Sequence, residues 1–197
     1  LLAYLRVLAN PDDEVSIRRI INLPKRGIGD RALEEVEIFA QAQDISFWNA
    51  LLRVSEAPSV PNKAAQSIAS FTSMLIALQT LVEAKTKPSV IIEAVLEQSG
   101  LLTELEASKD PQDEVRVENL KELVSASMEY EERPFDELGE DEEISLSGFL
   151  EKVSLVADAD EIPDGEDHGG VVTLMTLHTA KGLEFPTVFL TGMEDGI

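Results

Sequence analysis

Thr176-Leu-His-Thr-Ala-Lys-Gly-Leu-Glu-Phe185 is a short polar stretch between two runs of β-forming residues, Val171–Met175 and Thr187–Thr191. An apolar strand that ends in polar groups, turns through a glycine and enters a second apolar strand is typical of an open α/β sheet. In such sheets, ligands bind at the carboxyl ends of the strands. The sequence therefore predicts two β-strands of an α/β domain here, with a ligand site at the turn between them.

Four residues of this stretch are candidate ligand contacts. Thr176 and His178 would present hydrogen-bonding groups at the end of the first strand, and Glu184 would offer an acceptor to a sugar hydroxyl. Gly182 would let a ligand approach the backbone closely, because it has no side chain. The alternative is a plain strand–turn–strand unit whose polar residues only cap the turn.

The decapeptide closely resembles motif V of the superfamily 1 DNA helicases of the UvrD/PcrA/Rep type. The resemblance implies a segment of the second RecA-like domain that touches both single-stranded DNA and ATP. It places Thr176 and His178 against the DNA strand, and Gly182 and Glu184 against the nucleotide. Thr179 stands where relatives often carry Ser or Ala, which is a mild departure.

Composition limits the kinds of site that this chain can carry. It has no cysteine, which excludes disulfides and thiolate metal sites and agrees with a reducing cytosol. Its two histidines, His168 and His178, cannot form a His-rich metal site, so we predict no metal centre. No apolar run approaches the roughly 18–20 residues that cross a membrane, and Leu1–Leu5 lack the basic start of a signal peptide. These features predict a cytoplasmic protein with no membrane partner.

Charge is distributed unevenly along the chain, whose net charge is −22. The segment 129–167 holds sixteen acidic residues against two basic ones, whereas 18–31 holds five basic residues against one acidic residue. A strongly acidic body argues against general affinity for nucleic acid. The sequence therefore predicts one basic site on an acidic protein.

Helical periodicity dominates the chain ahead of the two strands. The expected helices carry these apolar positions: Leu1, Leu5 and Leu8; Val15, Ile17, Ile20 and Ile21; Leu33, Val36 and Ala40; Phe47, Trp48 and Leu51; Ile68, Phe71, Leu75, Leu78 and Val82; Ile91, Ile92 and Val95; Val117, Leu120, Val124 and Met128; Phe149, Leu150, Val153 and Val156. The segment 131–146 is too acidic to pack and predicts an exposed loop, and 157–170 reads as a linker.

Capping and breaking residues predict where these helices begin and end. Asp12 and Asp13 fit the start of one helix, and Asp30 is the expected N-cap of the next. Pro88 and Pro111 fit first turns, and Gly100 fits a helix end. Both ends of the sequence look cut, since it opens within an apolar helical pattern and stops just past a strand.

One helix, a helical body and then two strands indicate a helical domain inserted into an α/β domain. Three runs, Tyr4–Asp13, Ile20–Gly29 and Phe149–Asp158, also resemble the UvrD/PcrA family. In that family a helical subdomain called 2B is inserted into the RecA-like subdomain 2A. The resemblance implies a mainly α fold, with a 2B-like domain at 11–168 flanked by 2A pieces at 1–10 (one helix) and 169–197 (two strands).

A second candidate site is the turn Pro24-Lys-Arg-Gly-Ile-Gly-Asp30. Two glycines allow a tight turn with outward amides, and the following helix adds a partial positive end. The predicted duplex DNA contacts are the residues of this turn and the next cation: Lys25, Arg26, Gly27, Ile28, Gly29 and Arg31. Alternatively, the turn is a helix corner in which the glycines serve geometry and the cations are solvated. In the related helicases a Gly-Ile-Gly turn holds the duplex ahead of the fork, which favours the DNA interpretation.

Two other features have simpler interpretations. Phe47 and Trp48 could stack on a base, but their helical spacing beside Leu51 indicates core residues. The acidic run Glu137–Glu143 could hold a metal or dock a protein, yet it lacks regular ligand spacing and indicates a solvated loop.

The sequence lacks the phosphate-binding loop and the paired acids that ATP hydrolysis requires. The resemblance therefore implies part of an ATP-dependent 3′–5′ DNA helicase of repair or replication. ATP and Mg²⁺ would bind the parent protein, this fragment alone would be inactive with no cofactor bound, and DNA would be the partner, with repair proteins as further candidates. Two alternatives stay open: an autoinhibitory or protein-docking insert without DNA contact, and an unrelated helical scaffold.

Overall fold

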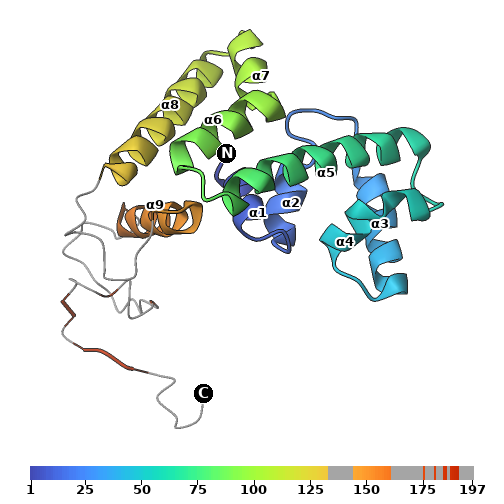
Figure 1. Ribbon diagram of the computed structural model, residues 1–197, viewed down its shortest axis with the longest axis horizontal. Helices are drawn as coiled ribbons and strands as arrows, with labels where there is room; N and C mark the ends of the chain where they lie inside the picture. Colours follow the sequence, from blue (N-terminus) through green and yellow to red (C-terminus); the bar gives the residue numbers. More distant parts are fainter. Residues whose placement is uncertain (133–143, 161–174, 176–179, 181–183, 186, 191–197) are drawn as a thin grey trace. The chain divides into compact units, whose positions relative to one another are not determined.

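Figure 1 shows the computed structural model of the chain, which describes residues 1–132, 144–160, 175, 180, 184–185 and 187–190. The chain divides into two compact units, Leu1–Val153 and Ser154–Ile197. The helices of the described residues are α1 (Leu2–Ala9), α2 (Glu14–Ile20), α3 (Asp30–Gln43), α4 (Phe47–Leu52), the 3₁₀ turn η1 (Val54–Glu56), α5 (Asn62–Glu83), α6 (Pro88–Ser99), α7 (Leu101–Ala107), α8 (Pro111–Glu131) and α9 (Leu146–Asp160).

Local sequence signals explain where several of these helices start and stop. The carboxylate of Asp13 caps α2 by accepting from the backbone and hydroxyl of Ser16, at 3.0 and 2.6 Å. Asp110 caps α8 through the amide of Gln112 at 2.9 Å. Gly100 ends α6 in the left-handed region, with φ of 76°. The two carboxylates satisfy backbone amides that a helix start leaves without an intrahelical partner, whereas Gly100 ends α6 by adopting a conformation that suits glycine.

The core of the first unit is built around α5, which packs against α1, α4 and α6 (Figure 1). Ile68, Phe71, Leu75 and Leu78 lie on one face of α5 and are at most 1% exposed. Their spacing of three and four residues places them on a single stripe. Among the described helices, α5 is also the one that is long and apolar enough to cross a membrane. Its apolar stripe nevertheless lies in the protein core.

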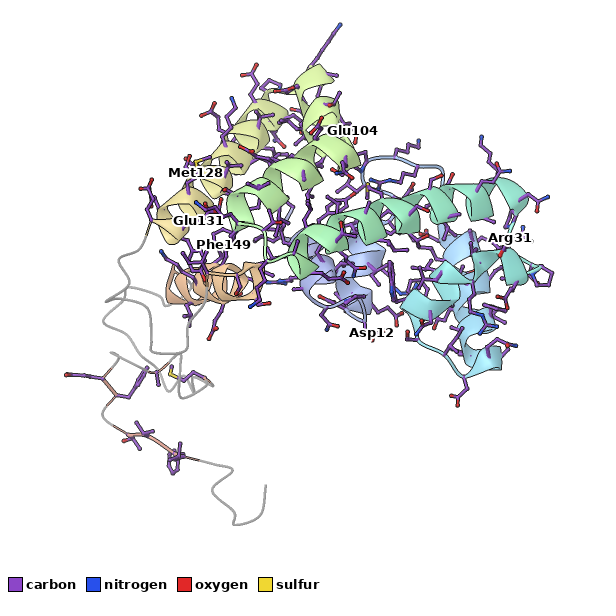
Figure 2. The ribbon with its side chains drawn as sticks, in the orientation of Figure 1. Asp12, Arg31, Glu104, Met128, Glu131 and Phe149 are labelled. Carbon is purple, nitrogen blue, oxygen red and sulfur yellow. The ribbon has the colours of Figure 1, made fainter. Side chains whose placement is uncertain are left out.

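A buried carboxylate joins the end of α8 to the start of α6 (Figure 2). The side chain of Glu131, 7% exposed, accepts hydrogen bonds from the amide of Ser89 at 2.7 Å and its hydroxyl at 3.1 Å. The ammonium group of Lys87 lies 3.9 Å away. Glu131 therefore supplies from a distant helix the N-terminal cap that the residues before α6 do not provide.

The predicted helical body is confirmed, with some corrections. Phe47 and Trp48 are buried, as their spacing indicates. Asp30 is wrong as an N-cap, because extended Gly29 takes that position and Asp30 is the first helical residue. Val117, Leu120 and Val124 pack as predicted, but Met128 is 44% exposed (Figure 2), because the packed face of α8 continues through Ser127. Helix α7 was not predicted from the sequence, and α9 extends to Asp160, into the predicted linker at 157–170.

The two predicted β-strands are not confirmed. The described residues contain no strand, and Thr187–Leu190 form a bend followed by irregular backbone. A strand exists only where a neighbouring strand supplies its hydrogen bonds, and none is present among these residues. Except for Met175, the first predicted strand lies outside the described residues, as do residues 133–143 of the loop predicted at 131–146. The ends of that predicted loop are wrong, because Glu131 belongs to α8 and Leu146 to α9, and both side chains are buried.

Candidate nucleic-acid interface

The turn between α2 and α3 is held in shape by a side chain that precedes it. The Asn22 side-chain oxygen accepts hydrogen bonds from the backbone amides of Arg26, at 2.8 Å, and Ile28, at 3.2 Å. The side chain of Ile28 is 1% exposed and lies in the core. Asn22 holds the turn at the amides of Arg26 and Ile28. The backbone of Gly27, which lies between them, and of Gly29, which follows, therefore has a defined orientation.

The two glycines of the turn leave its outer surface open. Gly27 has φ of +75°, a conformation that other residues rarely adopt. A Cβ atom added at Gly27 or Gly29 would meet nothing within 4 Å, so a ligand can approach the backbone at both. Within the described chain, the amides of Gly27, Gly29, Asp30 and Arg31 have no hydrogen-bond acceptor. The last three stand at the N-terminal end of α3, where the helix dipole favours an anion.

Exposed cations flank these amides. Lys25 and Arg31, the second of which is labelled in Figure 2, are both exposed, and neither forms an ion pair within the described residues. By contrast, the guanidinium group of Arg18 is occupied by Glu14 at 2.7 Å and Glu37 at 2.8 Å. Lys25 and Arg31, which flank the open amides, are therefore available to an anion.

The side chain of Arg26 points into the protein and not toward solvent. Its Nη1 atom donates to the carbonyl oxygens of Ile20 at 3.0 Å, Ile21 at 3.4 Å and Pro24 at 3.1 Å. Ile20 is the last residue of α2 and Ile21 is its C-cap. Arg26 therefore closes the end of α2 from the following turn.

The other guanidinium nitrogen of Arg26 reaches two further helices. Nη2 donates to the hydroxyl of Tyr4 on α1 at 2.7 Å and to the carbonyl of Ser99, the last residue of α6, at 3.2 Å. The guanidinium carbon lies 5.2 Å from the ring centroid of Phe71 on α5, a cation–π geometry. One side chain thus connects the turn with α1, α5 and α6.

A groove of about 570 Å³ opens beside Arg26, between α5 and the end of α6. Phe71 and Met74 contribute apolar surface to its lining, and the other lining residues are polar or charged. The lining residues are Arg26, Lys63, Gln66, Ser67, Ser70, Phe71, Met74, Gln98 and Ser99. Lys63 is exposed and adds one more cation near the turn. The described residues contain no cluster of three acidic or histidine side chains that could hold a metal ion.

The sequence of this chain matches the model of a known protein family. The UvrD-like helicase C-terminal domain matches residues 1–197. This chain belongs to that family. It is 49% identical over its whole length to the ATP-dependent DNA helicase UvrD1 of Mycobacterium bovis, 47% to UvrD1 of Mycobacterium leprae and 37% to the ATP-dependent DNA helicase PcrA of Bacillus subtilis. The chain spans about a quarter of the length of these relatives, 26% to 27%.

Within this UvrD-like domain, the predicted duplex contacts fall into two groups. Lys25, Gly27, Gly29 and Arg31 are exposed at the turn, as a DNA contact requires. The side chains of Arg26 and Ile28 do not extend from its surface, because one bonds to backbone carbonyls and the other fills the core. Asn22, Tyr4 and Lys63 were not predicted as functional residues from the sequence. An Asn just before a Pro and Gly-containing turn is a recognisable turn signal, whereas nothing local marks Tyr4 or Lys63.

The predicted motif V residues of this UvrD-like domain are mostly outside the described part. Thr176, His178 and Gly182 lie outside the described residues. Glu184 is described and exposed, and Phe185 next to it is 41% exposed. The roles of these residues therefore stay predictions.

Proposed function

We propose that this chain is part of an ATP-dependent 3′–5′ DNA helicase and that the turn between α2 and α3 holds the backbone of duplex DNA. Family membership and the names of the relatives support the first part. The observation that supports the second is the combination of open glycine backbone, amides without acceptors and the exposed cations Lys25 and Arg31.

The chemistry of the turn fits phosphate oxygens and not base edges. Backbone amides at a helix N-terminus are good donors to an anion, and two flexible cations can follow the strand on either side. Such contacts position a duplex without reading its sequence. We therefore expect duplex binding that does not depend on sequence.

The expected affinity is low. Each neutralised phosphate contributes about −0.9 to the slope of log affinity against log salt, so two cations give a slope of about −1.8. The net charge of −22 opposes binding elsewhere on the surface. We expect a dissociation constant in the micromolar range or weaker, on the order of non-specific binding.

The remaining roles follow the family resemblance. We propose that Thr176 and His178 contact single-stranded DNA and that Gly182 and Glu184 contact the nucleotide, which couples ATP to strand movement. ATP and Mg²⁺ would bind the whole protein, which would act in the cytoplasm on DNA in repair or replication. The segments 1–10 and 169–197 would belong to the RecA-like subdomain 2A, and 11–168 to the helical insert.

Charge reversal at the turn tests the duplex contact. Lys25→Glu/Arg31→Glu should lower the affinity of this chain for duplex DNA at least tenfold at low salt and flatten the salt slope toward zero, because both phosphate contacts become repulsive. Fluorescence anisotropy with a labelled duplex measures both quantities.

The matched control is Lys109→Glu/Lys121→Glu, which changes the net charge equally at exposed positions outside the turn. It should lower duplex affinity by less than twofold. Equal losses from the two double variants would mean that only overall charge matters, and the assignment of the turn would fail.

Unwinding by the whole protein distinguishes DNA contact from regulation. If the turn holds the duplex, Lys25→Glu/Arg31→Glu should reduce strand separation while ATP turnover on single-stranded DNA is kept. Faster unwinding by the same variant would instead favour an autoinhibitory insert.

A further inference from the structure

We infer that Tyr4 and Arg26 form a positioning pair that sets the conformation of the DNA-facing turn from inside the protein. Arg26 would thus act through the backbone and not by touching DNA, although the sequence alone places it among the phosphate contacts. The inference deepens the proposed function and rests on it where DNA affinity is concerned. Its structural part, the control of the turn by this pair, stands independently.

The contacts of Arg26 identify it as a cap for two helix ends. Its guanidinium group bonds to the carbonyls of Ile20 and Ile21 at the end of α2, and to that of Ser99 at the end of α6. The last carbonyls of a helix have no intrahelical donor and carry a partial negative charge. A planar cation with five N–H groups in a fixed fork can satisfy several of them at once.

Tyr4 holds the same turn at a second point. Its hydroxyl donates to the carbonyl of Leu23 at 2.7 Å and accepts from Nη2 of Arg26 at 2.7 Å. Tyr4 is 1% exposed, so it cannot touch DNA itself. Burial raises the pKa of the Tyr4 hydroxyl, which keeps the group protonated and able to donate.

Together these contacts fix the backbone on both sides of the Leu23–Arg26 segment. Tyr4 holds the carbonyl of Leu23, Arg26 bonds to the carbonyl of Pro24, and Asn22 binds the amide of Arg26. The exposed amide of Gly27 follows immediately in the chain. Its direction is therefore set by buried groups on α1 and by the end of α6.

The consequence is a link between α1 and the duplex contact. We assign α1 to the RecA-like side of the helicase, whereas the turn belongs to the helical insert. A change in α1 that moves the Tyr4 hydroxyl would alter the hydrogen bonds of Leu23 and Arg26, and with them the amides offered to a phosphate. Through this pair, the contact between the turn and duplex DNA depends on the position of α1.

Tyr4→Phe is the decisive variant, since it removes one hydroxyl, changes no charge and lies away from the surface. We expect it to shift the amide resonances of Gly27 and Gly29 in the ¹⁵N spectrum of this chain and to weaken duplex binding roughly fivefold. Tyr130→Phe is the control, because Tyr130 is also fully buried but lies on α8. It should leave both glycine resonances and duplex affinity unchanged.

Arg26→Lys gives a second, independent test, because it keeps the positive charge but loses the planar fork. A positioning role predicts shifted glycine resonances and an affinity loss of at least fivefold despite the retained charge. Circular dichroism confirms that each variant is folded, and if Tyr4→Phe does not fold, Arg26→Lys decides.

Two results would overturn the inference: glycine resonances that stay in place in both variants, or wild-type duplex affinity in both. A different failure belongs to the proposed function. If the wild-type chain binds no duplex at any salt concentration, the turn is not a DNA site, and the glycine resonances still decide whether Tyr4 and Arg26 position it.

Discussion

Arg26 and Glu131 stabilise helix ends in two regions of the molecule, and they do so with opposite charges. In the Arg26 corner, formed by α1, α2, the following turn and the end of α6, a cation bonds to carbonyls at helix C-termini. In the Glu131 corner, formed by α6, α7 and α8, an anion bonds to the amide at a helix N-terminus. Each side chain matches the sign of the helix end that it meets.

The two corners differ in what they leave exposed. The Arg26 corner keeps free amides and the cations Lys25 and Arg31 on its outer surface. In the Glu131 corner, the Ser89 amide donates its hydrogen bond to Glu131, and the neighbouring Glu129 and Glu132 are exposed acidic residues. A charged side chain that organises helix ends therefore does not by itself make a binding site. Outward donors are also required, and among the described residues the Arg26 corner offers the amides of Gly27, Gly29, Asp30 and Arg31 beside Lys25 and Arg31.

The largest expected difference is in stability. Arg26→Ala should cost about 3 kcal/mol of unfolding free energy, because it leaves several carbonyls and the Tyr4 hydroxyl without their donor. Glu131→Ala should cost about 2 kcal/mol of unfolding free energy, since it leaves mainly the buried Ser89 amide without its hydrogen-bond acceptor. Urea unfolding followed by Trp48 fluorescence measures both. A larger loss for Glu131→Ala would reverse our ranking of the two corners.

Glycine substitutions should separate conformation from binding. Gly27 and Gly100 have φ of 75° and 76°, and neither has a neighbour within 4 Å of an added Cβ. Gly27→Ala and Gly100→Ala should therefore each cost about 1–2 kcal/mol, because both force a left-handed conformation on a residue with a side chain.

Only the Gly27→Ala variant should also weaken duplex binding, by roughly fivefold or more, because only Gly27 lies at the exposed amides. Thermal unfolding and anisotropy provide the two measurements. Similar losses of duplex affinity in both variants would show that general destabilisation, and not the turn, controls binding.

The smallest effect concerns the helix caps. Hydrogen bonds from the hydroxyl and then the amide of Ser16 lower the pKa of Asp13 below 3.8. A depressed folded pKa means that Asp13 stabilises α2 above about pH 4 and loses this contribution as pH falls through the folded value. Asp13→Ala should cost about 1 kcal/mol at pH 7, and the difference from the wild type should narrow near pH 3.

Asp110→Ala is the comparison in the Glu131 corner. Asp110 makes a single cap hydrogen bond, to Gln112, and its loss should cost about 0.5 kcal/mol at pH 7. Urea titrations at both pH values test the pair. A cost for Asp13→Ala that does not change between pH 7 and pH 3 would contradict its role as an ionised cap.

Much of the helical framework could be predicted from local sequence. Pro88, Gly100 and Pro111 mark real helix boundaries, because their backbone restrictions act within one turn. The stripe on α5 is equally local, since it follows from a 3.6-residue period. The predictions failed where the arrangement of neighbouring helices sets the outcome. Helix α7 begins directly after Gly100 without a loop, and Met128 faces solvent because of the way α8 packs.

By itself, the sequence determined which chemical groups the turn between α2 and α3 contains. Two glycines, flanking cations and a helix start all lie within one short segment. Tertiary structure alone decided which of its residues face outward. Arg26 bonds to Ser99, 73 positions away, and to Tyr4, 22 positions away, and no local pattern encodes such contacts. A guanidinium group binds a phosphate or a helix-end carbonyl with the same donors, so the fold, by bringing those carbonyls within reach, sets the role of Arg26.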